Sequence, residues 1–168
     1  MTLRNHIAKL KLRDFIPDLI VVDYGDLMRS AKNYESKRFE QESVYEDLRG
    51  LAQEVNVPCW TASQTNRGAI DDDVISLSKI SECYGKVMVS DFMATMSRKN
   101  IYVAKNRSGP DNLVHPYSIN TSLAKIDIFS AISPELAEMF VNQTDDDKTI
   151  LKQKIKEFMQ NEMSGGTL

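Results

Sequence analysis

An uninterrupted apolar run followed at once by an acidic residue constrains the fold of this chain more than any other feature. The run is Leu19–Val22, and Asp23 follows it directly. Because apolar and polar residues do not alternate here, the run predicts a strand that is buried on both faces, as in the centre of a parallel sheet. A carboxylate at the C-terminal end of such a strand lies where open α/β sheets bind their ligands.

Four apolar residues and then Asp are also the pattern of the Walker B motif. In P-loop NTPases the Asp of that motif holds the Mg²⁺ that bridges the nucleotide phosphates. Asp23 is therefore a candidate ligand of Mg²⁺ and of a nucleotide. The alternative is a buried strand that simply ends in an acidic turn.

The composition favours an ordinary soluble protein with one core. The chain has 168 residues, 42% of them hydrophobic, and a net charge of −3, so a nucleic-acid site would have to be local. Its two cysteines, Cys59 and Cys83, favour reduced thiols in a cytosolic protein. The sequence has no CxxC or HExxH spacing for zinc, no signal peptide and no apolar stretch of membrane-spanning length.

Helical and strand patterns alternate along the chain, which predicts an α/β fold with a mostly parallel, twisted sheet flanked by helices. Helices are expected at 2–15, 36–55 and 79–90, from Ser133, and along the apolar stripe from Ile150 to Met159, with a disordered tail from Ser164. Strands are expected at 19–22, 59–63, 91–96, 101–104, 114–119 and 124–129, the last two closing the sheet at one side.

Polar side chains follow three of these strands, and we expect the three strand ends to share one edge of the sheet. Asp23 ends the first strand, Gln64 and Arg67 follow the second, and Lys105 and Arg107 follow another. Gln64 can hydrogen-bond a γ-phosphate and orient water. Lys105 and Arg107 stand two apart on an extended segment, so both point to one side, where they can stabilise a transferring phosphoryl group. An exposed basic loop is the alternative.

An acidic run, Asp71–Asp73, lies in the expected loop after Gln64. Such a run can bind a divalent metal, but acidic clusters are common in surface loops, and a solvated loop is the favoured reading.

Three segments in this order resemble the C-terminal motor domain of DnaB-type, RecA-like hexameric replicative helicases: LIVVDYGDLM, VPCWTASQTNR and IYVAKNRSGPDN. The form is most similar to helicases of T-even-like phages, and the resemblance covers roughly Thr2–Phe129. It implies that the first segment is Walker B, that Gln64 senses the γ-phosphate, and that Lys105 and Arg107 reach the nucleotide of the adjacent subunit.

The resemblance implies part of an ATP-dependent helicase that unwinds duplex DNA by hydrolysing ATP between the subunits of a hexameric ring. ATP and Mg²⁺ would be its cofactors, single-stranded DNA its partner, and the cytoplasm of a bacterium or phage-infected host its location. Arg67 and Lys79 are candidate DNA contacts in the loop after Gln64. We expect a motor segment over 1–130 and a helical extension over 131–168.

One family feature is missing, because no G-x-x-x-x-G-K-[ST] loop occurs anywhere in the sequence. In the family, that loop and the glutamate that activates water would lie N-terminal to Met1. We therefore expect the C-terminal part of a motor, truncated before Met1, which alone binds ATP weakly and hydrolyses it negligibly.

Two other functions fit parts of this pattern. A non-catalytic RecA-like scaffold without a P-loop would associate with itself independently of nucleotide, whereas an in-frame upstream P-loop would favour the helicase. Another RecA-like ATPase, such as a recombinase or a clock-type ATPase, is the third option, and the AKNRSGP segment argues against it.

Overall fold

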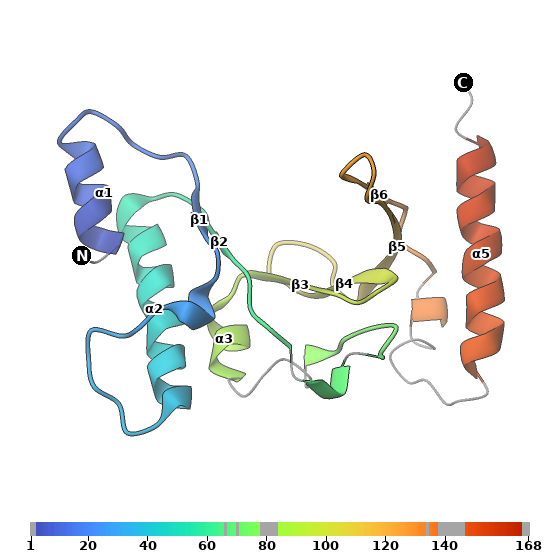
Figure 1. Cartoon of the computed structure of the whole chain (residues 1–168), viewed down its shortest axis with the longest axis horizontal. Coiled ribbons are helices and arrows are strands. Elements are labelled where there is room, and N and C mark those ends of the chain that lie inside the picture. Colours follow the sequence, from blue (N-terminus) through green and yellow to red (C-terminus); the bar gives the residue numbers. More distant parts are fainter. Residues whose placement is uncertain are drawn as a thin grey trace. The chain divides into compact units, whose positions relative to one another are not determined.

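The computed structural model describes residues 3–65, 67–69, 71–77, 84–133, 135–137 and 147–165. The chain divides into two compact units (Figure 1). The first unit comprises Met1–Thr65 and Ser81–Ser90, and the second comprises Asn66–Ile80 and Asp91–Leu168. In the part of the chain described, no helix is both long and apolar enough to cross a membrane.

A pair of parallel strands forms the centre of the first unit. Strand β1 (Ile20–Val22) pairs in parallel with β2 (Cys59–Thr61), and Val21 lies opposite Trp60. The other elements of this unit are α1 (Leu3–Lys11), η1 (Gly25–Leu27), α2 (Lys37–Val55) and α3 (Tyr84–Val89). Helix α2 is the long crossover between the two strands, as parallel pairing requires (Figure 1).

Helix α2 begins and ends where its sequence predicts. The Ser36 side chain accepts a hydrogen bond from the backbone N–H of Arg38 at 3.3 Å, which caps the first turn. Asn56 ends the helix in the left-handed conformation, with φ of 59°. Asn tolerates that conformation better than most residues, so the helix stops there.

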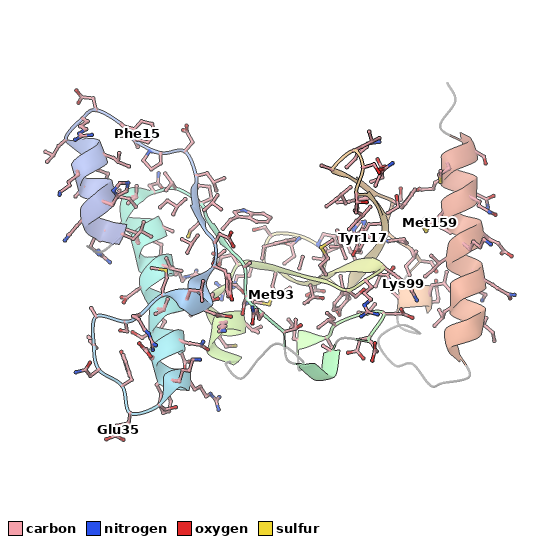
Figure 2. All side chains as sticks on the ribbon, in the orientation of Figure 1. Phe15, Glu35, Met93, Lys99, Tyr117 and Met159 are labelled. Atoms are coloured by element: carbon pink, nitrogen blue, oxygen red, sulfur yellow. The ribbon has the colours of Figure 1, made fainter. Side chains whose placement is uncertain are left out.

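Helix α1 is shorter than the expected helix over 2–15, because it ends at Lys11. Asp14 takes a φ of 56°, and the N–H of Phe15 turns back to the carbonyl oxygen of Leu10 at 3.1 Å. Pro17 also disfavours helical conformation at the residue before it. Phe15 therefore lies on the connection from α1 to β1 (Figure 2).

The parallel pair is covered on one face. Ile7, Ile20 and Leu51 are buried together, packed by Leu3, Val22, Val55, Val57 and Cys59. On the other face Val21 is 67% exposed and its partner Trp60 is 62% exposed. The prediction of a strand buried on both faces is therefore wrong for this chain. Among the described residues, the helical side chains of this core pack against one side of the pair.

The second unit contains a four-stranded antiparallel sheet in the order β3-β4-β5-β6. The strands are β3 (Phe92–Met96), β4 (Asn100–Asn106), β5 (Leu113–Asn120) and β6 (Lys125–Ile128). The expected strands form, but the prediction of a mostly parallel sheet is wrong. The physical reason is connection length, since only Ser97–Lys99 join β3 to β4, whereas a parallel crossover needs about a dozen residues.

The acidic run supports this sheet. Lys99 Nζ lies 2.9 Å from Asp73 Oδ1, and the side chains of Ser97 and Asn100 donate to the carbonyl oxygen of Asp73 at 2.7 and 2.9 Å. Asp73 is thus tied to the β3–β4 turn that carries Lys99 (Figure 2). The described residues hold no group of three or more His, Cys, Asp or Glu that could bind a metal.

The last helix belongs to the core of the second unit. Leu151 of α5 (Asp147–Gly165) is fully buried with Val114, Ile132 and Ala137, and Ile155 and Phe158 pack against the same cluster. The sequence left open whether this helix packs on its own chain or on a neighbour. The structure packs Leu151, Ile155 and Phe158 of its apolar stripe on its own chain, whereas Ile150 is exposed.

Candidate functional site

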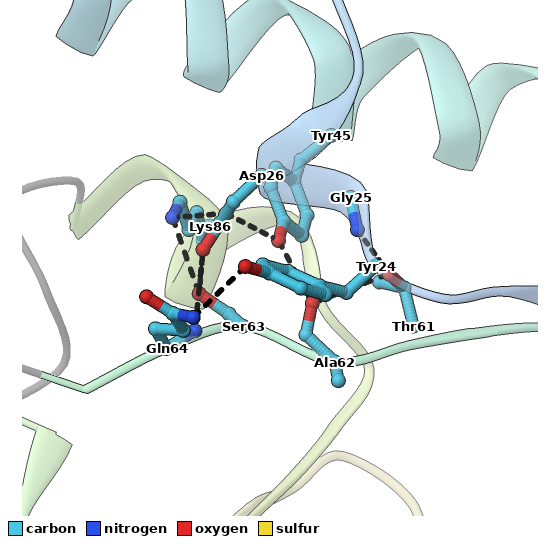
Figure 3. A network of polar contacts seen from close by, with 9 residues as sticks. All are labelled: Tyr24, Gly25, Asp26, Tyr45, Thr61, Ala62, Ser63, Gln64 and Lys86. Atoms are coloured by element: carbon cyan, nitrogen blue, oxygen red, sulfur yellow. Dashed lines mark hydrogen bonds and ion pairs between the residues drawn. The ribbon is translucent and has the colours of Figure 1, made fainter.

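Asp23 and Gln64 lie at the same edge of the parallel pair. Because Val22 pairs with Thr61, the chain leaves β1 and β2 at one edge, with Asp23 next after β1 and Gln64 shortly after β2. The Gln64 side-chain Nε2 donates to the Tyr24 hydroxyl at 2.8 Å (Figure 3). The amide of Gln64 is therefore fixed to the residue beside Asp23. The side chain of Gln64 is exposed, and that of Asp23 is exposed as well.

A second carboxylate, Asp26, is the centre of a polar network at this edge (Figure 3). Its Oδ1 accepts from Lys86 Nζ at 2.5 Å and from the Tyr45 hydroxyl at 2.8 Å. Its Oδ2 accepts from the Ser63 hydroxyl at 3.0 Å and from the backbone N–H of Gln64 at 3.2 Å. Four donors thus occupy this one carboxylate.

Lys86 is a buried charge with its partners in place. Its side chain is 1% exposed, and burying an ammonium group is costly unless it is paired and hydrogen-bonded. Lys86 Nζ contacts Asp26, lies 3.1 Å from Ser63 Oγ, and sits over the Tyr45 ring at 5.2 Å from its centroid. The network therefore compensates the charge on Lys86.

The same contacts set the charge of Asp26. Burial raises the pKa of its carboxyl group, but hydrogen bonds from Lys86, Tyr45 and the Gln64 N–H, with the Lys86 charge, outweigh burial and lower that pKa below its usual 3.8. Asp26 is ionised at neutral pH. Because its oxygens are occupied by donors of the protein, Asp26 is unsuited to bind a metal.

Gly25 lets the turn after Asp23 pack closely on its neighbours. Its N–H donates to Thr61 Oγ1 at 2.8 Å. A Cβ atom at this position would lie 3.0 Å from the Tyr45 ring and 3.2 Å from Thr61 Oγ1, closer than side chains normally approach. A glycine between Tyr24 and Asp26 therefore allows η1 to sit against β2 and α2.

Mg²⁺ is commonly held by one or two carboxylates, with waters and phosphate oxygens completing its shell. The exposed carboxylate of Asp23, directly after β1, fits that kind of site. Asp23 is therefore the residue of this edge that would hold Mg²⁺.

Lys105 and Arg107 lie on the second unit, at the end of β4. Lys105 pairs with Met93 beside an irregularity in the β3–β4 register, and Arg107 follows the strand. Arg107 Nη1 donates to Asp91 Oδ1 at 2.8 Å. Strand β4 belongs to the four-stranded sheet, so the prediction that all three strand ends share one sheet edge is wrong. Asp23 and Gln64 share an edge of the parallel pair, whereas Lys105 lies in β4 of the other sheet and Arg107 follows that strand.

The structure does not test the two residues predicted to contact DNA. Arg67 begins η2 (Arg67–Ala69), and Lys79 lies outside the described residues. Their role stays a prediction.

The sequence motifs do not point to Asp26 or Lys86. A lysine directly before the apolar run Val87–Val89 was a usable signal, because such a position tends to be buried and a buried lysine needs an acidic partner. That signal does not identify the partner, which lies 60 residues earlier.

Comparisons with known proteins show which family the chain is similar to. Residues 1–122 match the sequence model of the DnaB-like helicase C terminal domain family. The DnaB-like replicative helicase of Enterobacteria phage T4 is 33% identical over 96 residues, which are 55% of this chain and 20% of that protein. The replicative DNA helicase DnaB of Leifsonia xyli is 31% identical over 111 residues, which are 57% of this chain and 24% of that protein.

The chain thus spans about a fifth to a quarter of the length of these relatives. Among solved structures, one ATPase domain superposes with a TM-score of 0.62 at 17% identity, covering 76% of this chain and 50% of that one. A DnaB-like replicative helicase, solved in a study of its interactions with primase, gives a TM-score of 0.60 at 19% identity and covers 71% and 32%. With its fold shared with these proteins and its residues 1–122 matched, the chain belongs to the DnaB-like helicase C-terminal domain family.

Proposed function

We propose that this chain is part of the motor of a ring-shaped replicative DNA helicase, which hydrolyses ATP between neighbouring subunits to unwind duplex DNA. The observation that carries the proposal is the placement of Asp23 and Gln64 at one edge of a parallel strand pair, joined through Tyr24. A carboxylate and an amide at such an edge match the Mg²⁺ ligand and the γ-phosphate sensor of nucleotide motors.

In this proposal each side chain has a separate task. Asp23 holds Mg²⁺, which when bound neutralises charge on the nucleotide phosphates. Gln64 donates from its amide to the γ-phosphate and orients water. The phosphate cradle comes from a G-x-x-x-x-G-K-[ST] loop outside this sequence, within a RecA-like core.

Lys105 and Arg107 act on the nucleotide of the neighbouring subunit. Arg107 is exposed and follows the end of β4, where the chain turns at Ser108–Pro110. A guanidinium group in that position suits the charge that develops during phosphoryl transfer, and such a finger is typically worth about 10³ to 10⁵ in rate.

Single-stranded DNA is the proposed partner of the ring, with Arg67 and Lys79 as contacts. Residues 1–130 form the motor segment and 131–168 an extension. The end of the family match at residue 122 supports a boundary in this region.

The test is a chimera of the T4 phage relative in which this whole chain replaces the matching segment and the sequence after it, so that α5 keeps its place in the core of the second unit. We expect rings that hydrolyse ATP, and loss of hydrolysis with either Asp23→Asn or Arg107→Ala. Arg98→Ala, which removes another exposed arginine from the second unit, is the matched control. Rings that assemble without nucleotide and hydrolyse no ATP would favour the scaffold alternative.

Mixing the two inactive chimeras tests whether the finger acts between subunits. Each variant lacks a different half of the site, so mixed rings should regain activity at interfaces that combine an intact Asp23 with an intact Arg107. Mixed rings that assemble and stay inactive would overturn the role in trans. Full ATPase activity of the Arg107→Ala variant alone would show that Arg107 is not part of the catalytic site.

A further inference from the structure

One carboxylate holds two points of the chain that are far apart in sequence. Asp26 Oδ2 accepts from the Gln64 N–H at 3.2 Å, and Asp26 Oδ1 accepts from Lys86 Nζ at 2.5 Å. Ser63 bridges them, because its hydroxyl lies 3.0 Å from Asp26 Oδ2 and 3.1 Å from Lys86 Nζ (Figure 3). Asp26 thus gathers both ends of the stretch between Gln64 and Lys86.

We propose that Asp26 and Lys86 are positioning residues for Gln64: their ion pair fixes the backbone of Gln64 so that its side-chain amide reaches Tyr24 beside Asp23. The catalytic meaning of this arrangement rests on the proposed function. The geometry itself does not, and it can be measured without nucleotide.

Gln64 needs such support because its strand and its packing do not provide it. Strand β2 ends at Thr61, so Gln64 lies beyond the sheet ladder. Its side chain is exposed, so no buried surface holds it. A flexible side chain in this setting samples several rotamers, and a displacement of about 1 Å at a reacting centre can cost about a hundredfold in rate.

A buried ion pair is a poor device for stability alone. Replacing such a pair with apolar side chains of similar size is often neutral or stabilising, whereas removing one partner leaves a buried charge unpaired. Lys86 is 1% exposed, and its partner touches the backbone of Gln64 directly. The position of the Asp26–Lys86 ion pair is explained by its effect on the backbone of Gln64, which it holds in place after β2.

Because replacing both partners is tolerated better than removing one, the decisive variant is Asp26→Leu with Lys86→Met in the full chain. Removing both charges together should leave the chain folded while releasing Gln64. We expect the backbone amide of Gln64 to exchange with solvent at least about tenfold faster, measured by NMR. Its side-chain NH₂ resonances should move toward those of an unbonded glutamine, as they should in Tyr24→Phe.

Two further variants complete the NMR experiment. Arg29→Met breaks an ion pair with Glu40 in the same unit that is not part of the Asp26 network, and should leave the Gln64 resonances unchanged. If the double variant does not fold, Asp26→Asn with Lys86→Met keeps the shapes of both side chains, removes the ion pair without leaving a buried charge unpaired, and should give the same signature. Either double variant, folded and with unchanged Gln64 exchange and resonances, overturns the proposal.

The kinetic readout uses the chimera of the T4 phage relative. The double variant should lower kcat by about tenfold to a hundredfold with KM nearly unchanged, because Gln64 contributes to the reacting geometry. A normal kcat in a chimera that Gln64→Ala inactivates would overturn the positioning role. If Gln64→Ala itself has no effect, the proposed function of Gln64 fails, and the NMR result still decides the geometry.

Discussion

Arg107 is bound to Asp91 at two points: its Nη1 donates to Asp91 Oδ1 at 2.8 Å, and its backbone N–H donates to the Asp91 carbonyl oxygen at 2.9 Å. The backbone bond holds the end of β4 to the start of β3. The side-chain bond joins two exposed groups. The Arg107 guanidinium group therefore has a carboxylate partner in its own chain, and the proposed role between subunits requires it to exchange that partner for phosphate.

Arg107 should leave Asp91 easily, because exposed ion pairs contribute little to the stability of the folded chain. We expect Asp91→Asn to change the free energy of unfolding of the chain by less than about 1 kcal/mol, and less at high salt. Denaturant unfolding at two salt concentrations measures this. Asp127→Asn, which breaks the exposed pair with Lys125, is the control. A loss of several kcal/mol would mean that Asp91 holds Arg107 too firmly for a finger.

The isolated chain should hydrolyse ATP negligibly. Backbone N–H groups and a lysine of a phosphate loop supply most of the phosphate cradle, and the sequence contains no such loop. A phosphate-release assay on the purified chain checks this, with Asp23→Asn as control for contaminating activity. Robust turnover that Asp23→Asn abolishes would reveal a phosphate site among these residues.

Acid should remove the stabilising contribution of the Asp26 carboxylate. Its pKa in the folded chain is lowered from 3.8, so the charged form stabilises the fold above that pH and the contribution is lost as the pH falls through the lower, folded pKa. The difference in free energy of unfolding between the native chain and Asp26→Asn should therefore be full at neutral pH and shrink below about pH 4. A difference that grows on acidification would contradict the assignment.

Leu151 should be important for the stability of the second unit. It is fully buried among Val114, Ile132 and Ala137, so Leu151→Ala should cost about 2–5 kcal/mol. Ile150→Ala, at the exposed neighbouring position, should cost much less. Hydrogen exchange of the Val114 amide follows this unit separately from the first. Equal effects of the two variants would show that α5 is not part of the core.

Local features of the fold were predictable from sequence because their causes are local. Ser36 and Asn56 mark the ends of α2 through capping chemistry, and the short connections of the second unit predict hairpins. The prediction of a mostly parallel sheet was wrong. The run Leu19–Val22 indicates parallel pairing only for its own strand, and the later strands have connections that are too short for parallel crossovers.

The shared edge of Asp23 and Gln64 was predictable, because parallel strands end at the same edge of a sheet. Asp23 follows β1 directly, and Gln64 lies shortly after β2. The bond between Asp26 and Lys86 joins η1 to α3, and neither periodicity nor spacing encodes which carboxylate a buried lysine meets. The same holds for Arg107 and Asp91, whose pairing follows from the β3–β4 register.

The exposed face of the parallel pair carries a natural fluorescent probe. Trp60 is the single tryptophan of the sequence, and it lies opposite Val21 on the face of the pair that the described helices of the first unit leave exposed. An indole in water emits at longer wavelength than one in an apolar contact. Any polypeptide that covers this face will shift the emission of Trp60 to the blue, so fluorescence titration can detect such a contact without a label.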